Sequence, residues 1–247
     1  KFIPFVAETG GQNVMLADST SLIDQLIPDV IDSAFDSSGQ RCSALRVLFI
    51  QKDIKDVFYQ ALRGRLAVLN IESPFLRDTD FGPLIDDHAK QKLNEHIKWL
   101  DEHAKLIAEV KLPEQLPSEL YLAPCVYEIE DFSQLTQENF GPILHVIPFD
   151  HDELDEKIKQ INDSGYGLTL GVHSRNQRWI DYIIDHAIVG NIYINRNMIG
   201  AKVGSQPFGG HGLSGTGPKT GGPNYVHAFV KEYTITTNTS AFGGNQE

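Results

Sequence analysis

Short apolar runs alternate with amphipathic helical patterns along most of this chain, and this alternation restricts the folds that it can adopt. Helices are predicted from apolar residues spaced three and four apart. An order of strands separated by helices predicts an α/β fold with an open, mostly parallel, twisted sheet and helices on both faces. Six runs are apolar almost without interruption, as in strands covered on both faces: 46–51, 105–110, 123–129, 144–149, 168–173 and 191–195.

The helical patterns begin with Leu22 and continue to Phe35. Pro28 interrupts this first pattern and should kink the helix or mark its first turn. A second helix is expected from Ile54, with Asp53 placed to cap it. Further helical patterns lie in 89–104, 154–161 and 180–187.

The C-terminal tail has a different pattern. Tyr233 to Thr237 form a β-branched run that no helix follows. A strand without a neighbour in its own chain usually pairs with something else, such as another subunit. We therefore expect one α/β domain over 1–224 and a C-terminal strand extension within 225–247 that joins copies into a homo-oligomer.

Charge and composition exclude several classes of protein. The chain has 33 acidic and 21 basic residues and a formal net charge of −12, whereas nucleic-acid-binding proteins normally present a basic face. Hydrophobic residues make up 41% of the chain, which is enough to build a core. No apolar run approaches the ~20 residues that cross a bilayer. We expect neither nucleic-acid binding nor a membrane span.

The N-terminus and the cysteines indicate the setting of the protein. The sequence opens on Lys1 without a signal peptide, which suggests a piece of a longer protein. Two cysteines cannot form a disulfide framework, so we expect a reducing compartment, the cytoplasm. Other parts of the full protein could associate peripherally with a membrane. Cys125 lies in a strand pattern and is expected to be a buried small hydrophobe, and no metal-binding spacing is present.

Three short segments combine into a candidate for chemistry: "AETGGQN" around Glu8, "GQRCSA" around Cys42 and "QENFGP" around Glu138. Each alone has an ordinary interpretation, as a solvated carboxylate, a cysteine in a polar loop and a turn ended by Gly–Pro. Their order and separation, 34 and then 96 positions, resemble the signatures of the aldehyde dehydrogenase superfamily. The stretches "DFGPLIDDHA", "GYGLTLGVHSR", "GNIYINR" and "QPFGGHGLSGTG" are similar to that family as well.

Further residues indicate which subgroup of this superfamily the chain resembles. Arg41 and Ser43 beside the cysteine, Thr9 after the glutamate, and "SGTGPKTGGP" resemble the glutamate-semialdehyde (Δ1-pyrroline-5-carboxylate) dehydrogenases. The ending "TTNTSAFGGN" is similar to that of bacterial bifunctional proline-utilisation proteins, whose C-terminal half is this dehydrogenase. In such proteins FAD belongs only to a proline dehydrogenase domain upstream of this chain.

The resemblance implies a mechanism with NAD as the cofactor. Cys42 would attack an aldehyde to give a thiohemiacetal, and loss of hydride would leave a thioester. Glu8 would be the general base for hydrolysis, Glu138 would bind the nicotinamide ribose, and Phe140 would pack beside it. Phe140 could also be a plain core residue. Arg41, backbone amides and the cofactor's charge are expected to lower the thiol pKa.

The resemblance also assigns the substrate site. The substrate carboxylate would bind the Ser43 hydroxyl and the backbone amides of Gly200 and Ala201, where glycine permits an anion-binding nest. Arg41 could add charge there, or could form a salt bridge with a neighbouring acid. Phe208 would pack on the substrate's methylenes, or would be an ordinary core residue.

The expected function is therefore the NAD-dependent oxidation of L-glutamate γ-semialdehyde to L-glutamate in proline catabolism. A second possibility is another semialdehyde dehydrogenase with a similar pocket. A third is an inactive fragment that acts only as a folding or interaction module. No G-x-G-x-x-G follows a strand pattern, and the glycine-rich segment 209–217 is only a weak match to a phosphate-binding loop. The family's second oxyanion donor belongs to an upstream cofactor domain. Residues 1–247 alone are therefore expected to be inactive.

Overall fold

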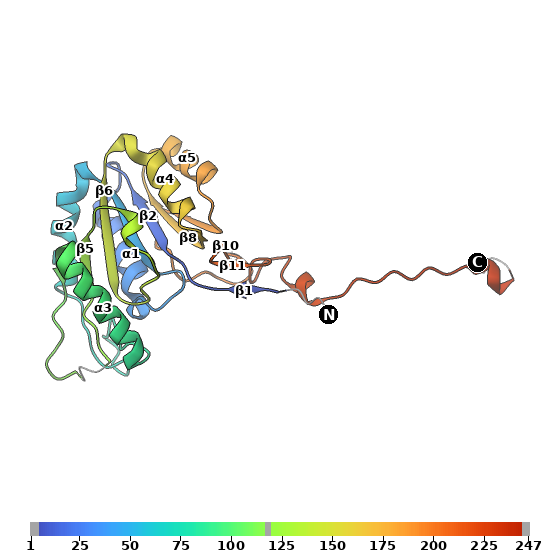
Figure 1. The fold of residues 1–247 in the computed structure, drawn as a ribbon, viewed down its shortest axis with the longest axis horizontal. Coiled ribbons are helices and arrows are strands. Elements are labelled where there is room, and N and C mark those ends of the chain that lie inside the picture. The colour runs from blue at the N-terminus through green and yellow to red at the C-terminus, as the bar shows by residue number, and fades with distance from the viewer. Residues whose placement is uncertain (1–4, 117–119, 244–247) are drawn as a thin grey trace.

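The computed structural model describes residues 5–116 and 120–243, and its centre is a seven-stranded sheet in the order β4-β5-β6-β3-β2-β8-β9 (Figure 1). Neighbouring strands are parallel, except that β4 at the edge runs antiparallel to β5. The strands are β2 (Asn13–Ala17), β3 (Leu45–Gln51), β4 (Lys105–Glu109), β5 (Cys125–Glu128), β6 (Ile143–Phe149), β8 (Thr169–His173) and β9 (Asn191–Ile194). The predicted mostly parallel sheet is confirmed.

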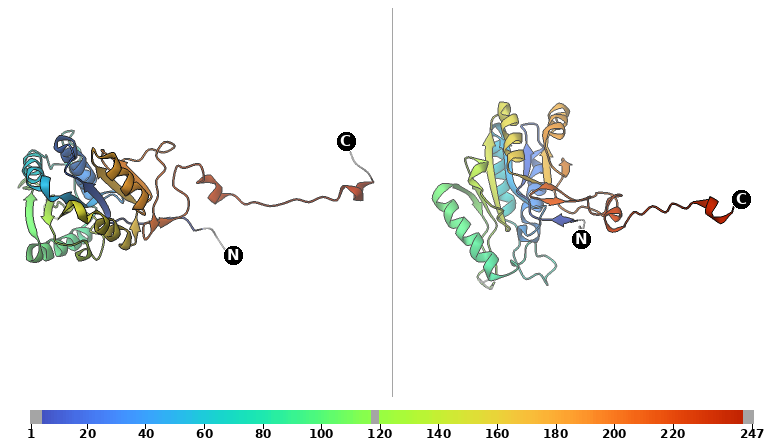
Figure 2. Two further views of the ribbon diagram at one scale, coloured as in Figure 1. Left: turned by 90° about the horizontal axis from the view of Figure 1, so that it is seen from above. Right: turned by 45° about the vertical axis from the view of Figure 1, so that its right-hand side comes forward.

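Helices cover both faces of the sheet (Figure 2). Side chains alternate along each strand, so Met15 and Ala17 of β2 lie in one core, and Val14 and Leu16 lie in the other. Two helices pack on the first core, α1 (Ile23–Phe35) and α2 (Lys52–Leu66). Three pack on the second core, α3 (Asp87–His103), α4 (Leu154–Asp163) and α5 (Gln177–His186).

The helix starts differ from the sequence predictions in two details. Pro28 does not mark a first turn, because α1 already begins at Ile23 and Pro28 lies inside it. Asp53 is not the cap of α2, since β3 leads directly into the helix and Gln51 is the N-cap residue. Asp53 lies in the first turn instead, where its negative charge favours the helix dipole.

A separate arm extends from one end of the sheet. In it β1 (Ala7–Glu8) pairs with β11 (Gly215–Thr216), and β7 (Tyr166–Gly167) pairs with β10 (His211–Gly212), both antiparallel. The glycine-rich segment 209–217 therefore forms short ladders that lead back to Glu8, rather than a phosphate-binding turn between a strand and a helix.

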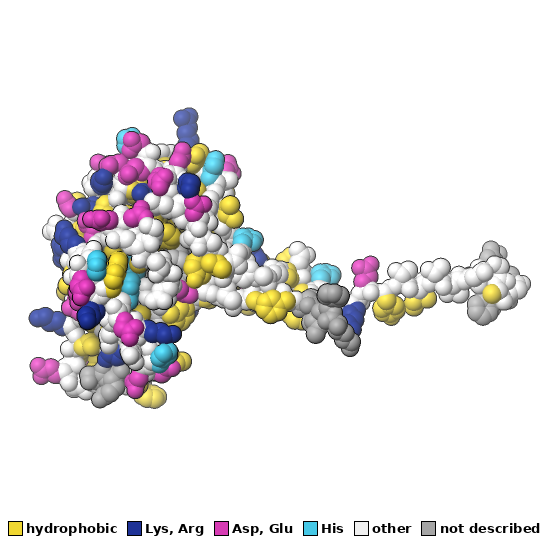
Figure 3. All heavy atoms as spheres, in the orientation of Figure 1, with side chains coloured by type: hydrophobic (Ala, Val, Ile, Leu, Met, Phe, Trp, Pro, Cys, Tyr) yellow, Lys and Arg dark blue, Asp and Glu magenta, His cyan; other side chains and the backbone are white. Residues whose placement is uncertain are grey.

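The tail leaves the body of the protein as an extended segment (Figures 1 and 3). Short 3₁₀ turns lie at Val226–Phe229 and Thr239–Phe242, and residues 230–238 between them form no strand. The C-terminal strand predicted at Tyr233–Thr237 is thus wrong for the chain by itself. A strand needs a neighbour for its backbone hydrogen bonds, and the described residues offer none here. Val230, Tyr233 and Ile235 remain exposed.

None of the helices in the described part of the chain combines the length and the apolar character that crossing a membrane requires.

Candidate active site

The three sequence segments that hold Glu8, Cys42 and Glu138 converge at the amino ends of the central strands. Glu8 precedes β2, Cys42 precedes β3 and Glu138 precedes β6. These strands are adjacent and parallel, so their amino ends lie side by side. Ligands of open α/β sheets commonly bind at the carboxyl ends of the strands. In this protein the candidate catalytic residues lie at the opposite, amino ends of the strands.

Asn13, the first residue of β2, fixes the cysteine to this edge. Its side-chain nitrogen donates to the carbonyl oxygens of Cys42 at 2.6 Å and Ala44 at 2.8 Å. Its side-chain oxygen accepts from the backbone N–H of Thr169 at 3.2 Å. Asn13 is buried, and it links the cysteine to the amino ends of β2 and β8. Sequence reasoning did not single it out.

Gly10 and Gly11, which follow Glu8 and Thr9, lie where a side chain would clash with neighbouring groups. A Cβ on Gly10 would lie 1.9 Å from the Glu138 Oε2 atom, and a Cβ on Gly11 would lie 2.9 Å from the Cys42 carbonyl oxygen. The backbone N–H of Gly11 also hydrogen-bonds the Glu138 carboxylate. Only a backbone without side chains can pass between these two groups.

Residues 36–44, which we call the cysteine loop, have an unusual backbone. Ser37, Ser38 and Gly39 adopt φ values of 54°, 56° and 66°, three consecutive residues in the left-handed region. A Cβ on Gly39 would lie 2.2 Å from the carbonyl oxygen of Gly141, so glycine is required here for space as well as for conformation. Ser38 holds the turn through its hydroxyl, which donates to the carbonyl of Gly82 at 2.7 Å.

The Cys42 thiol is partly buried and lies within electrostatic reach of both carboxylates. Burial raises its pKa above the ordinary thiol value, and the charges of Glu8 and Glu138 raise it further. The backbone N–H groups of Ser43 and Cys42 act in the opposite direction. The chain alone therefore favours the neutral thiol, and activation needs a positive charge that the predicted Arg41 does not supply.

Arg41 is engaged elsewhere. Its guanidinium forms a salt bridge with Asp36 at 3.0 Å and donates to the Ser37 hydroxyl at 3.0 Å, with the side chain 41% exposed. Of the two roles considered for Arg41, the structure shows the salt bridge with a neighbouring acid.

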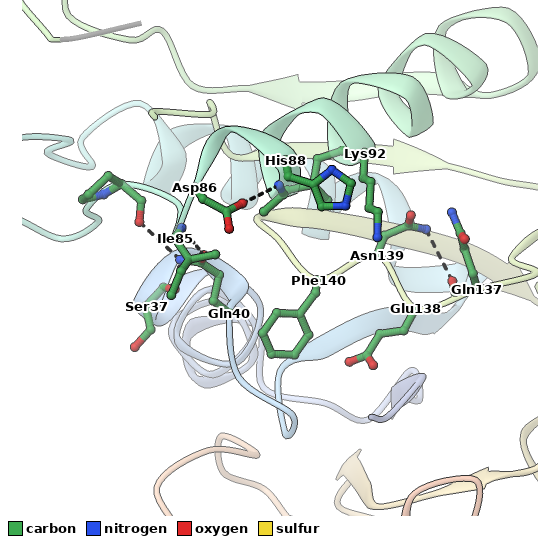
Figure 4. A pocket seen from close by; sticks show the side chains of 13 residues that line it. Ser37, Gln40, Ile85, Asp86, His88, Lys92, Gln137, Glu138, Asn139 and Phe140 are labelled. Atoms are coloured by element: carbon green, nitrogen blue, oxygen red, sulfur yellow. Dashed lines mark hydrogen bonds between the residues drawn. The ribbon is translucent and has the colours of Figure 1, made fainter. Parts of the chain in front are cut away.

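Glu138 and Phe140 line a cavity of about 680 Å³ (Figure 4). Phe140 is 41% exposed, so the interpretation as a core residue is wrong. Burial raises the pKa of Glu138, and the nearby Arg46 guanidinium opposes this shift. The remaining lining residues are Ser37, Gln40, Pro83, Ile85, Asp86, His88, Ala89, Lys92, Leu93, Gln137 and Asn139.

Glu8 is exposed and is held by the glycine-rich arm. Its carboxylate accepts a short hydrogen bond from the Thr220 hydroxyl. Thr220 in turn exchanges two backbone hydrogen bonds with Phe208, at 2.7 and 3.0 Å. The structure thus brings the predicted base and the predicted substrate-packing aromatic to the same arm.

The other predicted substrate residues lie in different settings. Ser43 is buried, 8% exposed, directly after Cys42. Gly200 has a φ of 75° and open space where a Cβ would lie, so its glycine serves the conformation alone. Ala201 is exposed, and Phe208 is half-buried. Sequence reasoning missed Arg46, which lies fully buried behind the cysteine.

The expectation for the second cysteine agrees with the structure. Cys125 is 1% exposed in β5, and burial raises its pKa strongly, as for a core thiol. Within residues 5–116 and 120–243, no group of three or more His, Cys, Asp or Glu side chains could hold a metal ion.

Comparison with known proteins decides the family. The sequence profile of the aldehyde dehydrogenase family matches residues 1–235. The chain belongs to this family. It is 48% identical to the bifunctional protein PutA of Escherichia coli K12 over 92% of its length, and 33% identical to a 1-pyrroline-5-carboxylate dehydrogenase of Bacillus subtilis over 90%.

Solved structures give the same placement within the aldehyde dehydrogenase family. A mutant of proline utilization A from Bradyrhizobium japonicum superposes with a TM-score of 0.92 at 50% identity over 97% of this chain. A Thermus 1-pyrroline-5-carboxylate dehydrogenase with bound NAD superposes with a TM-score of 0.84, at 32% sequence identity over 92% of this chain. The chain spans 18% of the length of the E. coli protein and 42% of the B. subtilis enzyme.

Proposed function

We propose that this chain is the catalytic domain of an NAD-dependent dehydrogenase that oxidises L-glutamate γ-semialdehyde to L-glutamate in proline catabolism. The observation that carries the proposal is the position of the Cys42 thiol, partly buried and within reach of the charges of Glu8 and Glu138. The names of the relatives, PutA and 1-pyrroline-5-carboxylate dehydrogenase, support this substrate over other semialdehydes.

The residues present fit the nicotinamide half of NAD. Glu138 presents an acceptor carboxylate to a cavity large enough for a ring and a ribose, and Phe140 offers an apolar face beside it (Figure 4). We assign the ribose hydroxyls to Glu138 and a packing role to Phe140. NAD⁺, when bound, supplies the hydride acceptor and a positive charge near the thiol. Such a charge would favour the thiolate of Cys42, which the chain alone disfavours.

In the proposed reaction, the Cys42 sulfur attacks the aldehyde carbon and its own backbone N–H stabilises the oxyanion. Loss of hydride leaves a thioester on Cys42. Glu8 takes a proton from water, and the resulting hydroxide releases glutamate and the free thiol. Because Glu8 is exposed and its carboxylate accepts a hydrogen bond from the Thr220 hydroxyl at the surface of the arm, this carboxylate can reach water.

The substrate's far end carries a carboxylate and an ammonium. We assign the carboxylate to the Ser43 hydroxyl and the Gly200–Ala201 amides, and the methylenes to Phe208. With a net charge of −12 the protein does not attract an anion at long range, so capture depends on these local donors. An enzyme with a catalytic thiol also suits a reducing compartment such as the cytoplasm.

Steady-state kinetics of the complete native protein that carries this chain tests the proposal. We expect saturable NAD⁺ reduction with glutamate semialdehyde, and a kcat/KM at least about tenfold higher than with aliphatic aldehydes that lack the charged end. Equal or better kcat/KM with the aliphatic aldehydes would favour another semialdehyde dehydrogenase. Residues 1–247 alone should show negligible turnover, as the inactive-fragment interpretation also requires, so the complete protein decides between the two.

We further propose that residues 1–224 form the catalytic domain and that 229–237 pair with another subunit. The exposed apolar side chains of Val230, Tyr233 and Ile235 support this, because an isolated extended segment gains stability only from a partner strand. Deleting 225–247 from the complete protein should lower the mass seen by light scattering to that of a smaller assembly. An unchanged mass would show that the tail does not hold subunits together.

A further inference from the structure

Arg46, the first charged residue of β3, is the most buried cation among the described residues. Its side chain is fully enclosed, at 0% exposure, between the sheet and the cysteine loop. Burying a guanidinium is costly unless hydrogen bonds and an opposite charge surround it. The contacts that it makes therefore indicate what this position is built to hold.

One set of contacts fixes the cysteine loop. Arg46 Nη1 donates to the carbonyl oxygen of Gly39 at 2.6 Å, and Nη2 donates to that of Arg41 at 3.1 Å. These carbonyls lie on the N-terminal side of Cys42. The guanidinium thus ties the strained turn and the residue before the nucleophile to one rigid strand.

A second set of contacts fixes the glutamate loop, residues 137–142. Nη1 also donates to the carbonyl of Gly141 at 3.2 Å, and Nη2 lies 3.5 Å from Oε1 of Glu138. The Arg46 guanidinium carbon lies 5.0 Å from the ring centroid of Phe140. A planar fork with several donors can make these bonds together, and a lysine ammonium cannot.

The backbone of Arg46 is anchored from the other side. Its carbonyl oxygen accepts from Nδ1 of His145 at 2.9 Å, so that nitrogen carries the proton. Nε2 of His145 is then the acceptor for His96 Nε2 at 2.8 Å. Burial lowers the pKa of His145 to about 3 and that of His96 to about 4, which keeps both rings neutral at physiological pH.

The positive charge of Arg46 interacts with both the Glu138 carboxylate and the Cys42 thiol. Burial lowers its pKa to about 10, and the charges of Glu138 and Cys42 oppose the shift. The guanidinium therefore stays protonated at neutral pH, paired with the carboxylate and attracted to a thiolate when one forms. Arg41, to which the sequence analysis assigned a positive charge near the thiol, is paired with Asp36 instead.

We propose that Arg46 is a positioning residue that locks the cysteine loop to the glutamate loop, so that the nucleophile and the ribose-binding carboxylate keep one fixed spacing. This inference rests on the proposed function and deepens it. The link predicts that a change at Arg46 weakens NAD⁺ binding and alters the reactivity of Cys42 together, although Arg46 is itself fully buried.

The test uses R46K, which keeps the charge and loses the fork, and R46Q, which loses both, in the complete native protein. We expect the Kd for NAD⁺, measured by calorimetry, to rise about tenfold or more in both variants. The midpoint pH of Cys42 alkylation by iodoacetamide, read by mass spectrometry without NAD⁺, should rise by about 0.5 or more in R46Q and by less in R46K. Arg63→Lys is the matched control, because Arg63 donates to the Ile107 carbonyl on a distant strand. It should leave both quantities unchanged.

If Arg46 had only a structural role, its substitution would change thermal stability without changing the Kd for NAD⁺ or the alkylation midpoint. If folded R46K and R46Q keep the native Kd and alkylation midpoint and lose only thermal stability, the proposal is overturned. Failure of both variants to fold at 25 °C would likewise assign Arg46 to the framework. The alkylation arm needs neither aldehyde nor turnover, so the link can hold or fail even if the complete protein oxidises no semialdehyde.

Discussion

Cys42→Ala should abolish NAD⁺ reduction by the complete protein, with kcat falling by a factor of about 10⁴ or more. In the proposed reaction the thiol holds the aldehyde carbon covalently. The substitution removes a half-buried sulfur and leaves the Asn13 bonds, which are made to backbone carbonyls. Binding of NAD⁺ should therefore persist, and calorimetry beside steady-state kinetics would show both results.

The second cysteine supplies the matched control for this prediction. Cys125→Ala removes the thiol of β5, which is buried in the hydrophobic core and does not line the cavity. It should lower the free energy of unfolding by about 1 kcal/mol and leave kcat unchanged. Retention of full activity in Cys42→Ala, or its loss in Cys125→Ala, would place the nucleophile elsewhere.

Glu8→Gln should separate the two halves of the reaction. Formation of the thioester needs no general base at Glu8, so each site should release about one NADH rapidly. Hydrolysis needs the base, and steady-state turnover should fall by about 10²–10⁴. Stopped-flow absorbance would show the burst followed by a slow rate.

Glu130→Gln is the matched control, because Glu130 is an exposed carboxylate of the β5–β6 connection. It should show native turnover. A Glu8→Gln protein that gives no burst and forms no NADH at all would assign Glu8 to the first half of the reaction, contrary to the base role.

Much of the fold could be predicted from the chain because its strands are buried on both faces and its helices are amphipathic. The central strand β2 was missed, since "NVMLA" is short and follows polar residues at once. The pairing of the tail could not be predicted from one chain, because strand formation depends on a neighbour. The Asp53 cap was wrong because β3 and α2 share their junction at Gln51.

The candidate site was predicted from the resemblance of its motifs to those of a known family, and its electrostatics were not predicted. Arg41 stands next to the cysteine in sequence, but three left-handed residues turn it toward Asp36. In the sequence Arg46 is a polar residue at the start of an apolar strand. Only the folded structure shows that its side chain donates to backbone carbonyls of the cysteine loop. Asn13 was hidden in the same way, since its role depends on carbonyls contributed by a distant loop.

The central claim is that a thioester forms on Cys42 and awaits water activated by Glu8. Acid quenching of the Glu8→Gln protein during the burst, followed by peptide mass spectrometry, tests it directly. We predict a glutamyl adduct on the Cys42 peptide, close to one per site, that appears only when semialdehyde and NAD⁺ are both present. A burst of NADH with an unmodified Cys42 peptide, or an adduct on another residue, would contradict the account.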